Sequence, residues 1–458
     1  MKTNKKILFF AMAMLLGTAC NKFLEVPSPA TKAESFKVFA DEKSADAAVS
    51  GVYAFLVSAN MQFFNGAITA YTGFSADEFA NTNKNTTYEP FRINAIPTEN
   101  EVVASNFWSN AYKGINHVNV SIEGLRANQT KYAPQKYRQL IGEMYFTRAL
   151  QYFYLVNLFG DVPLVIANDF EANALLPRTA KAKVYVQITE DLLQATANLT
   201  EGTHNLRPNR SAAWLLLARV YLYLEQWELA KAAAGEVISK GGYVLEPLAN
   251  TFLTTSRETV FQLMKPTANT AEAFTFVPSS TTAVPSFAIT DDLLSAFVAN
   301  DLRKNNWLKF NTVSGKNYYY PYKYKVRSGT AVSEYYVVLR LSEAYLIRAE
   351  AGAQLNLLDE AKEDIDQVRK KAALPLIQQT QPNITKEDLL QLIASERRLE
   401  LFAEWGHRWF DLKRTGKANA VLANLKGTDW NNSTNLFPIP YREMTYNFNL
   451  TQNDGYFK

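Results

Sequence analysis

Residues 211–240 read SAAWLLLARVYLYLEQWELAKAAAGEVISK, and this stretch has the clearest helical pattern in the chain. Its apolar residues recur three and four positions apart, which is the spacing of a helix with one buried face. Five positions match the tetratricopeptide-repeat pattern W-x2-L-G-x2-Y…A: Trp214, Leu217, Ala218, Tyr221 and Ala230. Ala218 takes the place of the glycine, where a small side chain lets two helices approach closely. The stretch therefore predicts a tetratricopeptide-like helix pair.

A second copy of this pattern follows at residues 342–375. Ala349 and Ala361 are twelve residues apart, as are Ala218 and Ala230. Two matches at one internal offset indicate a repeat architecture. The same periodicity predicts further helices, at residues 44–57, 108–125, 135–159, 182–199 and 386–405. The sequence thus predicts a mainly α fold, built on a tetratricopeptide-like helical-repeat scaffold.

Two long stretches interrupt the helical pattern, at residues 61–106 and 245–338. The second is rich in Thr, Ser, Pro, Asn and Tyr, with a short strand-like run at 259–263. Long non-repeat segments on a rigid scaffold usually carry function rather than packing. We therefore expect irregular, partly β insertions in a single domain that spans residues 20–458.

The composition excludes several classes of protein. Hydrophobic residues make up 47% of the chain and charged residues 20%, as in packed globular proteins. The single cysteine excludes an intramolecular disulfide, and the three histidines lie far apart, so we predict neither a metal site nor a cofactor. The net charge of +4 falls to about +1 without the lysines of the N-terminal leader, which argues against a nucleic-acid partner.

The N-terminus has the form of a bacterial lipoprotein signal. A short basic stretch precedes an apolar run of ten residues, 7–16, which is too short to span a bilayer as a helix. Small residues follow, and then Cys20. We expect residues 1–19 to be a signal peptide and Cys20 to be acylated, so that lipid anchors the mature chain. Gly17 stands where such signals usually have an aliphatic residue, so an ordinary secretory signal is the alternative.

A series of motifs, in order along almost the whole chain, resembles the SusD/RagB family of outer-membrane nutrient-binding lipoproteins. The most recognisable motif is Phe-Gly-Asp-Val-Pro-Leu at residues 159–164. The other matching motifs lie at residues 20–25, 148–156, 218–223, 339–350, 396–401, 406–414, 436–440 and 449–453.

The resemblance implies a binding protein and not an enzyme. Proteins of this family are lipid-anchored in the outer membrane and face the cell exterior. They pair with a SusC-like TonB-dependent transporter, capture oligosaccharides or, in some branches, peptides, and deliver them for import. Two alternatives belong to other classes: a tetratricopeptide scaffold that binds only protein partners and, with least support, a surface glycan hydrolase.

Aromatic residues in the two insertions are the candidate ligand-binding side chains. Strand alternation along residues 318–324, YYYPYKY, would place every second tyrosine on one face. Flat rings beside amides and lysines suit sugars, which present apolar C–H faces and polar rims. Six side chains are predicted to bind ligand: Trp307, Tyr318, Tyr320, Tyr322, Tyr88 and Phe91. The alternative is a half-buried strand that packs one tyrosine face against the helices.

Charged residues near the C-terminus predict structure rather than catalysis. Arginines and carboxylates between residues 396 and 411 are spaced to form a polar network, because a buried arginine needs a carboxylate partner. The neighbouring carboxylates Asp77–Glu78 and Asp291–Asp292 could in principle hydrolyse glycosides, but such pairs more often cap helices or face solvent. We predict no catalytic residue.

Overall fold

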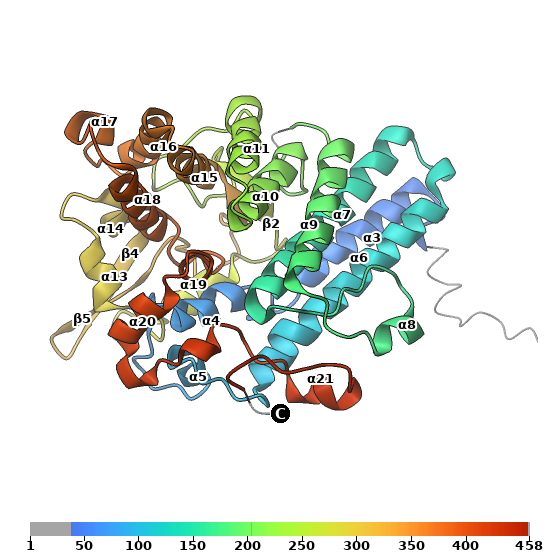
Figure 1. Cartoon of the computed structure of the whole chain (residues 1–458), viewed down its shortest axis with the longest axis horizontal. Coiled ribbons are helices and arrows are strands. Elements are labelled where there is room, and N and C mark those ends of the chain that lie inside the picture. The colour runs from blue at the N-terminus through green and yellow to red at the C-terminus, as the bar shows by residue number, and fades with distance from the viewer. Residues whose placement is uncertain (1–37, 203, 457–458) are drawn as a thin grey trace, which may run out of the picture.

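Helices packed side by side form most of the computed structural model, which describes residues 38–202 and 204–456. The predicted signal peptide and Cys20 lie outside the described residues. The long helices follow one another from right to left along the molecule in Figure 1, each packed on the next. They are α3 (Glu42–Leu56), α6 (Asn110–Ala127), α7 (Pro134–Phe159), α9 (Lys181–Asn198), α10 (Arg210–Tyr223), α11 (Trp227–Lys240), α15 (Leu341–Gln354), α16 (Leu358–Lys371) and α18 (Lys386–Glu400).

The two predicted helix pairs are confirmed as α10 with α11 and α15 with α16. Both pairs turn at the same place in the repeat, where Glu225 has φ 56° and Asn356 has φ 63°. The small residues at the repeat positions are fully buried. A Cβ added to Gly352 of α15 would lie 3.6 Å from the Cβ of Ala361 on α16, so these two helices approach closely at that point. Small side chains therefore set the spacing of the repeat, as its sequence pattern predicts.

The helix predicted over residues 386–405 is shorter than expected, because α18 ends at Glu400. Ala403 and Trp405 then adopt positive φ angles of 51° and 48°. Tertiary hydrogen bonds hold this turn: the Ala403 amide donates to Glu78 Oε1 at 3.2 Å and the Trp405 amide to Thr69 Oγ1 at 3.0 Å. These bonds offset the cost of an unfavourable backbone, which a local helical pattern does not reveal.

The described strands form three small antiparallel sheets. One of them joins the two insertions, because β1 lies in the first and β3 in the second. Another is the hairpin β4–β5, whose two-residue turn has positive φ at Ser314 and Gly315. The strands are β1 (Phe79–Ala80), β2 (Thr259–Leu263), β3 (Ala288–Ile289), β4 (Leu308–Val313), β5 (Lys316–Pro321) and β6 (Tyr336–Arg340), with β2 paired to β6.

Short helices fill the remaining segments. The first insertion carries α4 (Ala67–Ser75), α5 (Glu89–Arg92) and a π-helix over Val102–Ser109 that runs into α6. The second carries α12 (Ala271–Phe276), α13 (Asp291–Ala296) and α14 (Leu302–Trp307). The others are α8 (Phe170–Ala174), α17 (Ile377–Thr380), α19 (His407–Arg414), α20 (Ala418–Lys426), α21 (Tyr441–Tyr446) and 3₁₀ turns at 129–131, 427–429 and 432–434.

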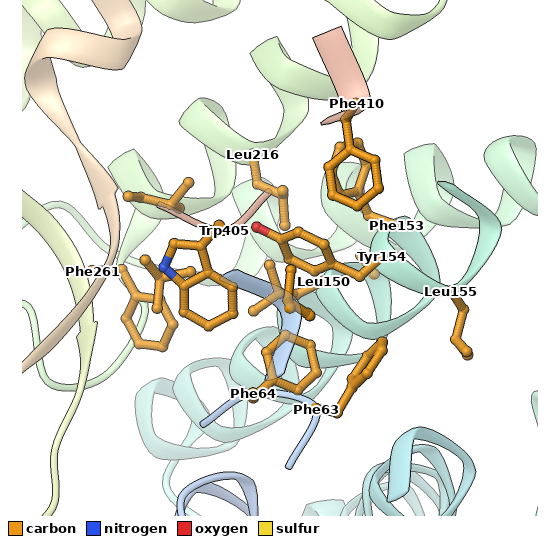
Figure 2. Packing of buried hydrophobic residues seen from close by; sticks show 14 of the residues in the cluster. Phe63, Phe64, Leu150, Phe153, Tyr154, Leu155, Leu216, Phe261, Trp405 and Phe410 are labelled. Atoms are coloured by element: carbon orange, nitrogen blue, oxygen red, sulfur yellow. The ribbon is translucent and has the colours of Figure 1, made fainter. Parts of the chain in front are cut away.

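Aromatic rings from distant segments meet in the hydrophobic core (Figure 2). Trp405 stacks on Tyr336 with ring centroids 4.3 Å apart, and its centroid lies 5.5 Å from that of Tyr154 on α7. Phe64, from the first insertion, packs 5.8 Å from both Tyr154 and Trp405. The insertions are therefore anchored in the same core as the helical repeats.

The polar network predicted near the C-terminus is confirmed and extends into the insertions. Arg340, which precedes α15, donates to Glu400 Oε1 at 2.6 Å, Glu404 Oε2 at 2.8 Å and Glu258 Oε1 at 3.0 Å. Arg303, from the second insertion, also donates to Glu400, at 3.3 Å. Burial acts to raise the pKa of the Glu400 carboxyl, but Lys371, Arg340 and Arg303 together hold it well below its ordinary value.

Candidate functional site

The two insertions meet along a short seam of backbone pairing. Phe79 pairs with Ile289 in the β1–β3 sheet, and the amide of Thr290 donates to Glu78 O at 3.0 Å. Beyond the sheet, Asn83 Nδ2 donates to Ser286 Oγ at 3.0 Å. Segments about 200 residues apart in sequence thus form one continuous surface.

A cluster of aromatic rings packs on the inner side of this surface. Tyr88 stacks on Phe74 with centroids 5.2 Å apart and an angle of 16° between the rings. Phe287 lies 4.9 Å from Tyr88, and Phe276 lies 5.1 Å from Phe287. Phe74 and Phe287 are fully buried, so these rings belong to the packed interior and do not offer an open face to a ligand.

A cleft of about 450 Å³ opens above these rings, between the two insertions. We call it the insertion cleft. It is lined by Asn60, Met61, Asn83, Tyr88, residues 274–279, residues 283–287 and Arg327. The β4–β5 hairpin holds the segment around residues 280–283 in place, because Asn311 on β4 donates to Ser280 O at 2.9 Å and to Ala283 O at 2.7 Å.

Phe274 is the most exposed aromatic ring in the lining, with 49% of its surface accessible. The Arg327 guanidinium lies 4.5 Å from the centroid of this ring, and Arg327 Nη1 donates to Val277 O at 2.8 Å. The arginine therefore orients the ring and covers one side of it. An exposed, oriented ring at a cleft is a surface on which a flat apolar face of a ligand can stack.

The structure corrects the prediction for three of the six candidate residues. Trp307, Tyr320 and Phe91 are buried, so none of them presents an open ring face to a ligand. Trp307 Nε1 donates to Leu248 O at 3.0 Å, and Phe252 packs edge-on to its ring. Tyr320, opposite Lys309, lies at the end of the β4–β5 hairpin where Leu308 and Pro321 are buried as well. The half-buried tyrosine strand, which was the alternative, describes this segment better.

The other three candidates remain partly accessible. Tyr88 lines the insertion cleft, and burial raises the pKa of its hydroxyl, which stays protonated at neutral pH. Tyr318 lies on β5, with Lys316 Nζ 5.2 Å from its ring centroid, and Tyr322 directly follows β5, with Lys309 Nζ 4.8 Å from its ring centroid. The structure brings only Tyr88 to the cleft lining.

Sequence reasoning missed Phe274 and Arg327. Both lie in the predicted insertion, but they are 53 residues apart and neither belongs to an aromatic run. The pattern also could not show that burial on β5 increases along the strand and does not alternate between its faces. Phe310, opposite Tyr319, is exposed, with 46% of its surface accessible.

One buried carboxyl, that of Glu272, lies two residues before Phe274 on the same short helix. Glu272 is 1% exposed, and burial raises the pKa of its carboxyl to about 8. The hydroxyls of Tyr336 and Thr69 act in the opposite direction on this pKa. Glu272 is therefore neutral below that pH and gives the cleft no negative charge.

One carboxylate of each pair considered for hydrolysis, Asp77 and Asp292, is bonded to arginine. Asp77 accepts from Arg408 Nε at 2.8 Å and from Arg398 Nη2 at 2.9 Å, and Arg398 also bonds Asp292 at 2.5 Å. The arginines hold the pKa of Asp77 below its ordinary value. These groups link the insertions to α18 and α19, as structural ion pairs do.

Over residues 38–202 and 204–456, no group of side chains is arranged to hold a metal ion. In the same ranges, no helix combines the length and apolar character that crossing a bilayer requires.

Comparison with known proteins assigns the class of this fold. Two family models match adjacent parts of the chain: one described as the SusD family over residues 299–456, and one described as "Starch-binding associating with outer membrane" over residues 22–222. Curated relatives and solved structures of the same class match most of the chain. The chain belongs to the SusD/RagB family, whose proteins are non-catalytic.

Individual relatives are distant but cover much of the chain. A SusD-like protein of Formosa agariphila is 26% identical over 84% of this chain and 86% of its own length. The starch-binding protein SusD of Bacteroides thetaiotaomicron is 24% identical over 69% of this chain and 72% of its own length. Both relationships extend well beyond a single motif.

Solved structures establish the fold. A SusD superfamily protein from Bacteroides vulgatus superposes with a TM-score of 0.79, at 20% identity, over 91% of this chain and all of that one. A structure described as a laminarin binding SusD-like protein superposes with a TM-score of 0.75, at 23% identity, over the same shares of the two chains. These likenesses confirm the predicted mainly helical fold.

Proposed function

We propose that this protein captures an oligosaccharide in the insertion cleft, with one sugar ring stacked on Phe274. The observation that carries the proposal is the half-exposed Phe274 ring, held by Arg327 at a cleft built from both insertions. Pyranose rings have apolar C–H faces that pack on aromatic rings, and their hydroxyl rims need donors and acceptors nearby.

The lining of the insertion cleft suits a neutral sugar. Asn60 and Asn83 offer amide groups, and Ser279 and Ser286 offer hydroxyls. Arg327 is the one charged side chain in the lining, and its Nη1 already donates to two backbone carbonyl oxygens, those of Phe274 and Val277. The names of two relatives, a starch-binding and a laminarin binding protein, support a neutral glucan as the class of ligand.

The predicted cellular setting completes this proposal. We infer that residues 1–19 are a signal peptide, that Cys20 carries the lipid anchor and that residues 20–458 form one mature domain on the cell surface. The description of one matching family model, which refers to association with the outer membrane, supports this location. The protein then delivers its ligand to a SusC-like TonB-dependent transporter.

The ligand class is tested by isothermal titration calorimetry of the purified mature protein. The panel contains maltoheptaose, laminariheptaose, other neutral oligosaccharides and a pool of short peptides. The proposal predicts saturable binding to at least one oligosaccharide without release of shorter products. Binding only to peptides would replace sugar with peptide as the ligand, and hydrolysis of the sugar would favour the glycan hydrolase.

Partner binding is tested separately, by purifying the tagged protein from detergent-solubilised outer membranes of its own host. Recovery of a large β-barrel transporter in near-equal amount supports delivery to that transporter. Recovery of other protein partners alone, together with no sugar binding, would favour the tetratricopeptide scaffold as the function.

A further inference from the structure

A second and larger cleft lies outside both insertions. It has a volume of about 630 Å³ and is formed by the N-terminal part of α6, the α8 segment and the α21 segment. We call it the α8–α21 cleft. In Figure 1, α8 and α21 lie together at the lower right, whereas β5 and α13 of the second insertion lie at the left. The two clefts share no lining residue.

Hydrogen bonds between distant segments hold the α8–α21 cleft open. Asn447 Nδ2 donates to Leu176 O at 2.8 Å and Asn449 Nδ2 donates to Leu175 O at 2.7 Å, which joins the α21 segment to the α8 segment. On the opposite wall, Tyr112 Oη of α6 donates to Pro163 O at 2.9 Å. The walls are thus connected in the protein itself, as in a pre-formed ligand site.

Two large aromatic rings in the lining are exposed far beyond what packing requires. Phe170 on α8 has 86% of its surface accessible, and Tyr446 on α21 has 74%. Ile166 and Leu175, within five residues of Phe170 in the same segment, are also exposed. Large apolar side chains that are exposed together at a cleft of a folded protein mark binding sites.

The polar groups of this cleft select an uncharged ligand rich in hydroxyls. Lys113 and Glu443 contribute one charge of each sign, and the remaining polar lining is mostly amides and hydroxyls, from Ser109, Asn116, Asn168, Asn173 and Asn447. Burial lowers the pKa of His117, which is neutral at pH 7. None of the described strands borders the cleft, so an extended peptide would find no strand edge to pair with.

We propose that the α8–α21 cleft is a second binding site for neutral glycan, with sugar rings stacked on Phe170 and Tyr446. The class of ligand rests on the proposed function, but the site does not depend on the insertion cleft. A long polysaccharide held at both clefts is retained more strongly than at either one, because the second contact is intramolecular. The α8–α21 cleft thus keeps the polymer on the protein while another part of it occupies the insertion cleft.

The test combines variants of each cleft with two measurements. Phe170→Ala/Tyr446→Ala removes the rings of the α8–α21 cleft, and Phe274→Ala removes the ring of the insertion cleft. Phe448→Ala is the matched control, because Phe448 is 77% exposed but does not line the cleft. Stoichiometry is measured by calorimetry with maltoheptaose and laminariheptaose, and retardation is measured in native gels that contain starch or laminarin.

The proposal predicts two sites on the wild type and one on Phe170→Ala/Tyr446→Ala, with gel retardation weakened about 2- to 10-fold per ring removed. Phe448→Ala should match the wild type. A Tyr446→Trp variant provides a second readout, because sugar stacking should change its tryptophan fluorescence on titration. The variant rings are exposed, so circular dichroism should show unchanged helix content.

The remaining outcomes show which of the two binding sites is wrong. Unchanged stoichiometry and retardation in Phe170→Ala/Tyr446→Ala, or an equal loss in Phe448→Ala, overturns the second site while the insertion cleft stands. Loss of all binding in Phe170→Ala/Tyr446→Ala, with no effect of Phe274→Ala, supports the α8–α21 cleft and contradicts the insertion cleft. A wild type that binds no oligosaccharide of the panel and neither polysaccharide overturns both.

Discussion

Replacing Trp307 with alanine should destabilise the protein without removing a contact to the ligand. The Trp307 ring is fully buried, with Phe252 at 5.7 Å and Phe402 at 6.4 Å between ring centroids. Truncation of a buried tryptophan to alanine costs about 3–5 kcal/mol through lost burial and the cavity left behind. The substitution also removes the donor of the 3.0 Å bond to Leu248 O, worth about 1 kcal/mol on its own.

A buried cation adds to this cost. Lys323 Nζ lies 4.5 Å from the centroid of the Trp307 ring and donates to Glu400 O at 2.8 Å. Burial lowers the pKa of this lysine to about 8, so its charge already depends on nearby partners. Loss of the ring removes a cation–π contact there. The expected decrease in the free energy of unfolding for Trp307→Ala is thus about 4–6 kcal/mol.

Urea denaturation followed by far-ultraviolet circular dichroism measures this loss, with Trp227→Ala as the control at a half-buried tryptophan. Trp227→Ala should lose clearly less stability. Sugar affinity is then measured for both variants in the absence of urea, at a temperature where both are folded. Wild-type stability combined with weakened sugar binding in Trp307→Ala would refute the assignment of this ring to the core.

Three further predictions address the scaffold, a buried carboxyl and the anchor. Ala218→Leu should lower the free energy of unfolding by about 1–3 kcal/mol by overpacking the α10–α11 contact, and an unchanged melting temperature would count against the repeat geometry. Burial raises the pKa of Glu272 to about 8 from an ordinary value of 4.5, so its contribution to stability falls as pH rises through that window. Glu272→Gln should therefore gain stability relative to the wild type by up to about 1.4 kcal/mol per pH unit between pH 5 and 8. If urea denaturation gave the same difference in the free energy of unfolding between variant and wild type at every pH, this prediction would be wrong. Cys20→Ala should abolish metabolic labelling with palmitate, and full labelling of the variant would disprove the proposed anchor.

The helical scaffold could be predicted from the sequence because its determinants are local. The spacing of small and apolar residues in 211–240 and 342–375 reports directly on which side of each helix is buried. The end of α18 could not be predicted in this way. Thr69 and Glu78, whose side-chain oxygens accept the amide hydrogens of the turn after Glu400, lie more than 300 residues earlier in the chain.

The candidate site was predictable only in part, for a related reason. A strand pattern with a period of two gives two faces but does not say which one is buried. On β5 burial follows the position along the strand instead, because Lys316 and Asn317 are exposed, whereas Tyr320 and Pro321, on opposite faces, are both buried. Phe274 and Arg327 come together only through folding, and the walls of the α8–α21 cleft come from three segments far apart in sequence.

The affinity of Phe274→Ala for the best oligosaccharide of the panel tests the central claim most directly. Leu229→Ala is the control, because Leu229 is an exposed apolar residue on α11 that lines neither cleft. A stacked ring is worth about 0.5–1.5 kcal/mol, so the dissociation constant of the insertion cleft should rise about 2- to 10-fold in Phe274→Ala and stay unchanged in Leu229→Ala. An unchanged dissociation constant in a folded Phe274→Ala protein would contradict oligosaccharide capture in the insertion cleft.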